Sequence, residues 1–140
     1  MDIQSTQRWR GRMTKPKANT GNGLLRGFLG RCPACGTGRL FRAFTKVADH
    51  CPACGEAFHH HRADDFPAYV VIVVVGHIVV PLAMIVEIAY QPSYWLHAAI
   101  WLPLVLALGI GLLQPVKGLI VALQWQMGMH GFAEAKLARR

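Results

Sequence analysis

Two long apolar runs dominate the second half of the chain. The first, Ala68–Val86, holds nineteen residues with no formal charge, and reads AYVVIVVVGHIVVPLAMIV. At 1.5 Å per residue a helix of this length is about 28 Å long, close to the roughly 30 Å hydrocarbon core of a bilayer. A strand is excluded, because globular strands are much shorter. The second run, Leu96–Leu113, is similar, so we predict transmembrane helices over about residues 67–89 and 95–114.

The short segment Tyr90–Trp95 separates the two runs and carries aromatic residues at both edges, as at a membrane interface. A loop this tight makes residues 64–115 an antiparallel hairpin, so both chain ends lie on one side of the membrane. All fifteen Lys and Arg residues lie on those ends and none lies in the loop. The positive-inside rule therefore predicts that both termini and everything before the hairpin are cytoplasmic.

A third stretch of apolar character follows the second run. Helix from Trp95 straight to Met129 would be about 52 Å long, which is too long for a bilayer. Because Pro115 and Lys117 interrupt the pattern, we predict a helix break at the cytoplasmic interface. Residues 116–140 are then predicted to form an interfacial amphipathic helix with a short basic tail.

The first half of the chain is basic rather than apolar. Residues 1–66 contain eleven Lys and Arg against five acidic residues, a balance of +6 within a total of +8. Residues 1–23 contain no apolar run, so we predict neither a signal peptide nor a folded element there. They are predicted to be a disordered basic tail, either solvated or resting on anionic lipid headgroups.

All four cysteines occur in two copies of the pentapeptide CPACG. Fifteen residues separate the two pairs, and the pattern C-x2-C-x15-C-x2-C is typical of a structural zinc site with four thiolate ligands. The glycine after each pair permits a tight turn beneath the sulfurs. Four thiolates leave no open position for water, so we predict one structural zinc ion bound by Cys32, Cys35, Cys51 and Cys54.

Residues 24–63 are predicted to be a cytoplasmic zinc ribbon with short β elements. Residues 38–49 have the pattern of a strand pair or a strand and turn, and the predicted small core is Leu40, Phe41, Phe44, Val47 and Phe58. So small a core needs the metal for its stability. An iron ion in the same thiolates and a redox dithiol pair are the alternatives, while disulfides are disfavoured in a reducing cytosol.

Three ionisable side chains interrupt the apolar runs, and such residues usually face protein or water rather than lipid. An antiparallel hairpin centred near residue 92 places Glu87 and His97 at equal depth, so we predict that they pair. His77 lies about 15 Å deeper. A packing hydrogen bond is favoured for it over contact with a haem or quinone or a proton-transfer step.

Small residues within the two runs suggest how the helices meet. We predict that Gly76, with Gly109 and Gly111 opposite, permits close contact between them.

Three consecutive histidines, His59, His60 and His61, precede the hairpin. A transient copper or zinc site is one interpretation of them. A polar linker at headgroup level is favoured, because three adjacent imidazoles cannot all reach one ion from a regular element. Asp64 and Asp65 are interpreted as a helix cap. The chain shows no nucleophile–base pair, phosphate-binding loop or paired carboxylates beside a substrate pocket, so we predict that the protein is not an enzyme and has no small-molecule substrate.

Several segments resemble one bacterial family of uncharacterised zinc-ribbon membrane proteins, the domain of unknown function nine-eight-three. They are residues 31–41 (RCPACGTGRLF), 51–55 (CPACG), 64–69 (DDFPAY), 76–81 (GHIVVP) and 114–118 (QPVKG). The resemblance covers roughly residues 24–130. It implies a small protein of the bacterial inner membrane, and members in alphaproteobacteria tend to be encoded near terminal oxidase subunits and their assembly factors.

We therefore expect a non-enzymatic accessory or assembly protein that docks onto a larger membrane complex, with cytochrome c oxidase as the complex that the resemblance suggests. One alternative is a protein that handles copper or zinc through the three histidines. The other is a membrane-tethered nucleic-acid binder that uses Arg31, Arg39, Arg42 and Lys46 beside Phe41 and Phe44. Contact of these basic residues with lipid headgroups is favoured over contact with nucleic acid.

Overall fold

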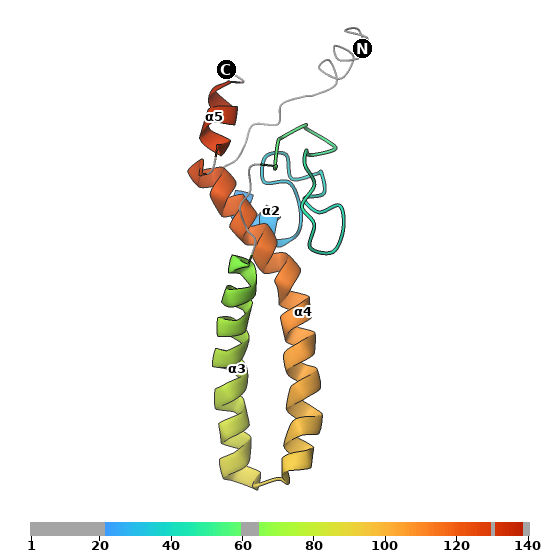
Figure 1. The fold of residues 1–140 in the computed structure, drawn as a ribbon, viewed down its shortest axis with the longest axis vertical. Helices are drawn as coiled ribbons and strands as arrows, with labels where there is room; N and C mark the ends of the chain where they lie inside the picture. The colour runs from blue at the N-terminus through green and yellow to red at the C-terminus, as the bar shows by residue number, and fades with distance from the viewer. Residues whose placement is uncertain (1–21, 60–64, 130, 139–140) are drawn as a thin grey trace.

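The computed structural model describes residues 22–59, 65–129 and 131–138. Four helices lie within these ranges: α2 (Gly23–Phe28), α3 (Phe66–Tyr90), α4 (Tyr94–Met127) and α5 (Phe132–Leu137). Figure 1 shows α3 and α4 side by side as a long hairpin, with the rest of the described chain gathered at the end opposite the loop. We call residues 22–59 the head. The predicted combination of two long apolar helices with a cysteine cluster is confirmed.

The first long helix, α3, begins where the sequence indicates. Pro67 lies in the first turn, where its missing N–H has no helical partner to lose. Asp65 occupies the N-cap position, and its carbonyl accepts a hydrogen bond from the Ala68 N–H at 3.0 Å, although its carboxylate makes no capping hydrogen bond. Asp64 lies outside the described residues. Gln91 ends the helix in the left-handed region, with φ of 43°.

The two long helices meet along a valine face. Val71, Val75 and Val79, spaced four residues apart, are the buried side chains in the middle of α3. They belong to one apolar cluster against which Trp101 and Leu108 of α4 pack. The predicted glycine contact is wrong: apart from the neighbouring backbone of its own helix, no described atom lies within 4 Å of the position where a Cβ would stand on Gly76, Gly109 or Gly111. Successive helical residues are separated by about 100°, so Gly76 turns away from the face that Val75 presents.

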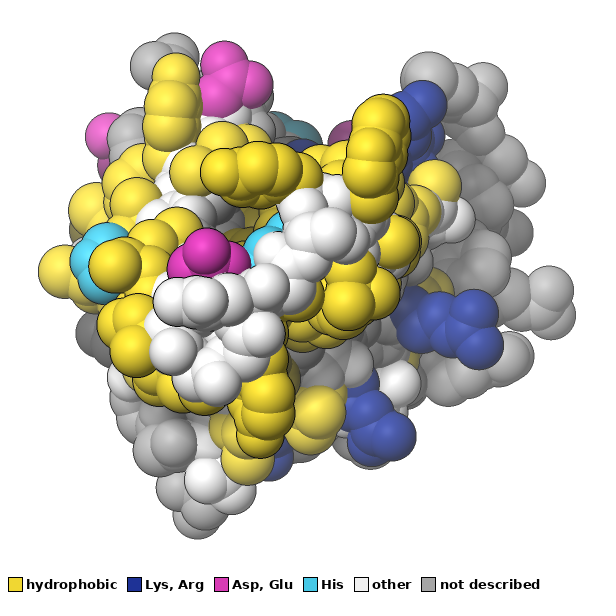
Figure 2. Space-filling view, turned by 90° about the horizontal axis from the view of Figure 1, so that it is seen from below, with side chains coloured by type: hydrophobic (Ala, Val, Ile, Leu, Met, Phe, Trp, Pro, Cys, Tyr) yellow, Lys and Arg dark blue, Asp and Glu magenta, His cyan; other side chains and the backbone are white. Residues whose placement is uncertain are grey.

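Most other side chains of the hairpin are apolar and exposed. Seen from the loop end, Figure 2 shows hydrophobic side chains over most of this face, with the basic side chains lying behind them. Ile85 and Leu102, for example, are 61% and 63% exposed. Both helices are long and apolar enough to cross a membrane. An apolar surface of this extent is typical of contact with lipid or with another membrane protein.

The second long helix, α4, does not break at Pro115. It runs without interruption for 34 residues, about 51 Å, with Pro103 and Pro115 inside it, so the predicted break and the separate interfacial helix are wrong. Pro115 removes one backbone hydrogen bond, but the residues that follow it, from Val116 to Trp125, are largely buried. Their packing against the head compensates for the lost bond.

The head packs on the part of α4 that extends beyond the start of α3. Counted from the loop, Phe66 is the twenty-fifth residue of α3 and Gly118 is the twenty-fifth residue of α4, so these two lie at about equal height. The rest of α4 continues beyond the start of α3, and Figure 1 shows this part leaning across above α3, beside α2. Residues after Gly118 are therefore an extension of the second long helix. The short helix α5 follows it.

The head has less regular structure than predicted. Within residues 22–59 the structure contains no β-strand, and its β character is limited to three isolated antiparallel bridges, Arg31↔Arg39, Phe41↔Val47 and His50↔Ala57. The β elements of a ribbon are therefore not confirmed. The predicted small core is present, and Leu40 and Phe58 are fully buried in it. Phe44 is the exception, because it is 52% exposed.

Candidate metal centre

The four cysteine sulfurs converge inside the head. Cys32 Sγ lies 3.7 Å from Cys54 Sγ, and Cys35 Sγ lies 3.7 Å from Cys51 Sγ. All four sulfurs lie within 4.8 Å of one another, and none is in a disulfide. A regular tetrahedron with Zn–S bonds of about 2.3 Å has edges of about 3.8 Å. The cluster therefore has the dimensions to hold one four-coordinate metal ion.

Both CPACG segments fold into the same turn. The N–H of Gly36 donates to the Cys32 carbonyl at 2.8 Å, and the N–H of Gly55 donates to the Cys51 carbonyl at 2.9 Å. Gly36 and Gly55 adopt φ of 74° and 73°, a region that strains residues with a side chain. The predicted role of these two glycines is confirmed.

Gly38 is a third glycine at this centre, and the sequence reasoning missed it. A Cβ built on Gly38 would overlap the Cys51 sulfur. Its N–H also points toward the Cys35 sulfur at 3.4 Å, and the Thr37 hydroxyl donates to the same sulfur at 3.3 Å. Gly38 therefore contacts both CPACG turns, which we call the knuckles. The one available signal was its place two residues after the first CPACG segment.

The thiols differ in how readily they ionise. Cys54 has a pKa lowered to about 5, chiefly by a hydrogen bond from Cys32, and the same bond together with burial raises the pKa of Cys32. Burial also raises the pKa of Cys51. Burial opposes ionisation of Cys35 too, but the hydrogen bond from Thr37 and nearby backbone N–H groups outweigh it and lower its pKa. A bound divalent cation would favour the charged form of all four.

Two contacts fix the metal centre to α4. The indole Nε1–H of Trp125 donates to Glu56 Oε1 at 3.1 Å, and Glu56 directly follows the second knuckle. On the other side of the head, α2 crosses α4 where Gly27 and Gly118 meet, so closely that a Cβ on either glycine would overlap the other's backbone carbonyl. The head is thus packed directly on the helix.

The predicted pair in the hairpin is confirmed. His97 Nε2 lies 2.7 Å from Glu87 Oε2, and the Trp101 indole N–H donates to His97 Nδ1 at 2.9 Å. Because Nδ1 accepts this bond, Nε2 carries the ring proton and donates it to Glu87. The sequence reasoning missed Trp101, although its place four residues after His97 on one helix face is a usable signal.

The remaining predicted residues lie apart from these groups. His77 is exposed on α3, where its Nδ1–H donates to the Val73 carbonyl of the same helix at 2.8 Å. The His59 ring lies 5.4 Å from the His50 ring, centroid to centroid. His60 and His61 lie outside the described residues, so the metal-binding alternative for the three histidines stays a prediction.

Comparison with known proteins identifies the chain's family. A family model described as "Protein of unknown function (DUF983)" matches residues 41–125, more than half of the chain, so the protein belongs to this family. The matched region contains Cys51, Cys54 and most of both long helices, while Cys32 and Cys35 precede it. Neither the curated proteins nor the solved structures include a match.

Proposed function

We propose that this member of the DUF983 family is a non-enzymatic membrane accessory protein, which holds a small metal-bound head at a fixed position on a transmembrane hairpin for docking onto a larger membrane complex. The attachment of the head to α4 carries the proposal. The crossing of Gly27 with Gly118 and the bond from Trp125 to Glu56 hold the head directly against α4. A head attached in this way is suited to presenting the same surface to a partner at a constant distance from the membrane.

The metal in this proposal is one structural zinc ion, and the head is a minimal zinc ribbon. The two sulfur–sulfur distances of 3.7 Å support a tetrahedral site. Four thiolates complete the coordination sphere of zinc and leave no position for water or substrate, which supports a structural role over a catalytic one. Iron fits the same four thiolates and is the alternative ion.

The orientation we propose places the head and both chain ends in the cytoplasm, with the hairpin in a bacterial inner membrane. The charge distribution supports it, because Gln91, Pro92 and Ser93 of the loop are uncharged while the basic residues lie at the head end.

The partner we propose is an integral membrane complex. The hairpin buries a single valine face and leaves large apolar side chains uncovered along its length. It also exposes polar groups among them, since His77 is exposed and the Glu87 side chain is 55% exposed. Polar groups at such depth usually face protein rather than lipid. A terminal oxidase, cytochrome c oxidase, or one of its assembly intermediates is the complex that the resemblance in sequence suggests.

Affinity purification from solubilised native membranes tests the proposal. We expect the full-length protein to recover respiratory-complex subunits or their assembly factors well above the level of an unrelated tagged hairpin protein. The variant Cys32→Ser/Cys35→Ser, which disrupts the metal centre, should recover much less. Recovery of the wild type alone, as a monomer or homo-oligomer, would contradict the proposal.

A further inference from the structure

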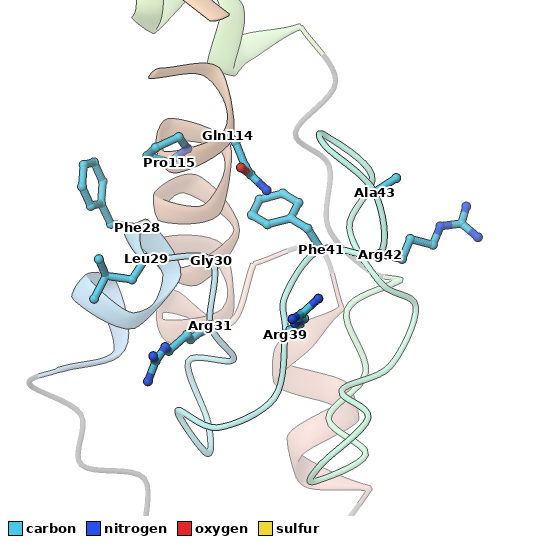
Figure 3. Close-up of a pocket in the computed structure, with 10 residues that line it drawn as sticks. All are labelled: Phe28, Leu29, Gly30, Arg31, Arg39, Phe41, Arg42, Ala43, Gln114 and Pro115. Carbon is cyan, nitrogen blue, oxygen red and sulfur yellow. The ribbon is translucent and has the colours of Figure 1, made fainter. Parts of the chain in front are cut away.

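A cavity of about 520 Å³ lies where the head, including the end of α2, meets α4. Its walls combine two chemistries, as Figure 3 shows. Apolar side chains come from Phe28, Leu29 and Phe41, and cationic ones come from Arg31, Arg39 and Arg42. A mixed wall of this kind fits a ligand that is itself part apolar and part anionic.

The cavity lies at the height where the hairpin ends. Gln114 and Pro115 line it, and they are within one turn of Gly118, which is level with the start of α3. If the two helices cross a bilayer, this height is that of the phospholipid headgroups on the head side. The inference depends on this membrane crossing and on no protein partner.

The two chemistries are also ordered along the membrane normal. In Figure 3 the pale green start of α3 is at the top, so the hairpin lies above the cavity. Phe28 and Pro115 lie on the hairpin side, whereas Arg31 and Arg39 lie on the opposite side, and Arg42 points outward. A phospholipid has the same order, with acyl chains toward the hydrocarbon core and the phosphate toward water.

Two of the arginines concentrate positive charge at one place in the cavity wall. Arg31 and Arg39 stand directly opposite each other in an antiparallel bridge, an arrangement that destabilises like charges. Both side chains are exposed, and neither forms an ion pair with any acidic side chain in the described part of the chain. In Figure 3 the two guanidinium groups point in different directions, so a phosphate in the cavity would accept charge-assisted hydrogen bonds from one of them and be attracted by the charge of the other.

We propose that this cavity binds the headgroup phosphate of an anionic phospholipid. Arg31 and Arg39, which both line the cavity, supply the positive charge for the phosphate. Phe28 and Leu29, which are 39% and 63% exposed, contact the upper part of an acyl chain. A lipid held here touches the head and α4 together. It would therefore help to set the height of the head above the membrane.

Native mass spectrometry of the purified full-length protein tests this site. The protein is reconstituted in phosphatidylcholine nanodiscs with a minor fraction of phosphatidylglycerol, and the lipids that stay bound after release are identified. We expect phosphatidylglycerol to be enriched over its bulk fraction. Arg39→Gln should reduce the enrichment about tenfold and Arg31→Gln/Arg39→Gln by more than tenfold, since a hydrogen bond between charged groups contributes on the order of a factor of ten.

Matched variants distinguish lipid binding in this cavity from a general attraction of anionic lipid to positive charge on the head. Lys46→Gln removes one exposed positive charge of the head outside the cavity and should leave the enrichment unchanged. Arg31→Lys/Arg39→Lys keeps both charges and should retain most of it. Equal losses in Lys46→Gln and Arg39→Gln would overturn the proposal, as would the absence of enrichment in the wild type. Metal content measured on every variant verifies that the head is folded.

A further arm distinguishes the lipid from soluble phosphate. Sodium phosphate is titrated into delipidated protein by calorimetry. Binding of phosphate that needs Arg39, combined with no enrichment of phosphatidylglycerol, would assign the site to a soluble anion and overturn the proposal. Because no partner protein is present, the result is independent of the purification from native membranes.

Discussion

At the scale of single residues, the metal centre depends on a glycine without a side chain as well as on the four cysteine sulfurs. Gly38 lies where a side chain would overlap the Cys51 sulfur, and its backbone N–H approaches Cys35. Because Gly38 has no side chain, the two CPACG turns can approach each other closely at this residue. A methyl group here would overpack the site, because a sulfur that binds a metal ion cannot move aside.

We predict that Gly38→Ala lowers metal occupancy and destabilises the head by about 1–3 kcal/mol, the usual range for overpacking a well-packed core. Metal analysis and chemical denaturation of the purified protein would measure both effects. Gly111→Ala is the control, because no described atom lies near its Cβ position. Full occupancy and unchanged stability of Gly38→Ala would show that the head adjusts freely.

The cysteine pKa values determine how pH acts on metal uptake. Cys32 and Cys51 have raised pKa values and keep their protons at neutral pH in the metal-free head, whereas Cys54, with a pKa of about 5, is already ionised. Binding must therefore release at least two protons, and the affinity should fall as pH falls. A release of two protons gives about a hundredfold loss per pH unit. Competition with a zinc chelator between pH 6 and pH 8, with the chelator's own titration corrected, checks this, and an affinity independent of pH would contradict it.

At the scale of elements, α4 has two roles along its length. Its first part packs on the valine face of α3, and its last part, from Val116 to Trp125, forms the base of the head. The surroundings of one glycine in each part of α4 illustrate these two roles. Gly118 is covered by Gly27 of α2, while nothing described lies near the Cβ position of Gly109.

The same substitution at these two glycines should have opposite effects. Gly118→Ala places a methyl group against the Gly27 carbonyl and should destabilise the head by at least 1–3 kcal/mol, the typical cost of overpacking. Gly109→Ala should be neutral or stabilise the helix by up to about 1 kcal/mol, because alanine is the better helix former. Protease sensitivity of the head and unfolding in detergent measure the difference. Equal effects at the two sites would show that α2 does not pack on α4 in solution.

At the scale of the whole molecule, two units with different sources of stability share one helix. The head has a small core and four cysteines that can hold one metal ion, so we expect its stability to depend on that ion. Each helix of the hairpin forms most of its backbone hydrogen bonds within itself, away from its internal prolines, which is what a bilayer requires. Trp125 joins the units, since its indole contacts Glu56 of the head from the end of α4.

Removal of the metal should therefore unfold one unit and spare the other. We predict that a strong chelator exposes the head to proteolysis, while the circular dichroism of the long helices changes little. The fluorescence of Trp125, measured in variants that lack the other tryptophans, should shift to the red as the head detaches. Loss of most helical signal on chelation would mean that the hairpin also depends on the metal.

The sequence alone determined the features that depend on spacing along the chain. The repeated CPACG segments identified four ligands that meet in space, because two residues between cysteines suit one tetrahedral ion whatever surrounds it. Long uncharged runs identified the two helices, because the bilayer thickness sets their length. The antiparallel symmetry of a hairpin identified the pairing of Glu87 with His97.

Only the tertiary structure decided the features that depend on contacts between distant segments. Whether Pro115 ends a helix depends on the packing of the residues after it against a head that lies far earlier in the chain. The bond between Glu56 and Trp125, which are 69 positions apart, illustrates this. The outward position of Gly76 and the close contact at Gly38 also follow from neighbours that no local pattern specifies. Local periodicity fixes which elements form, but burial of one surface against another decides which face is used and where an element ends.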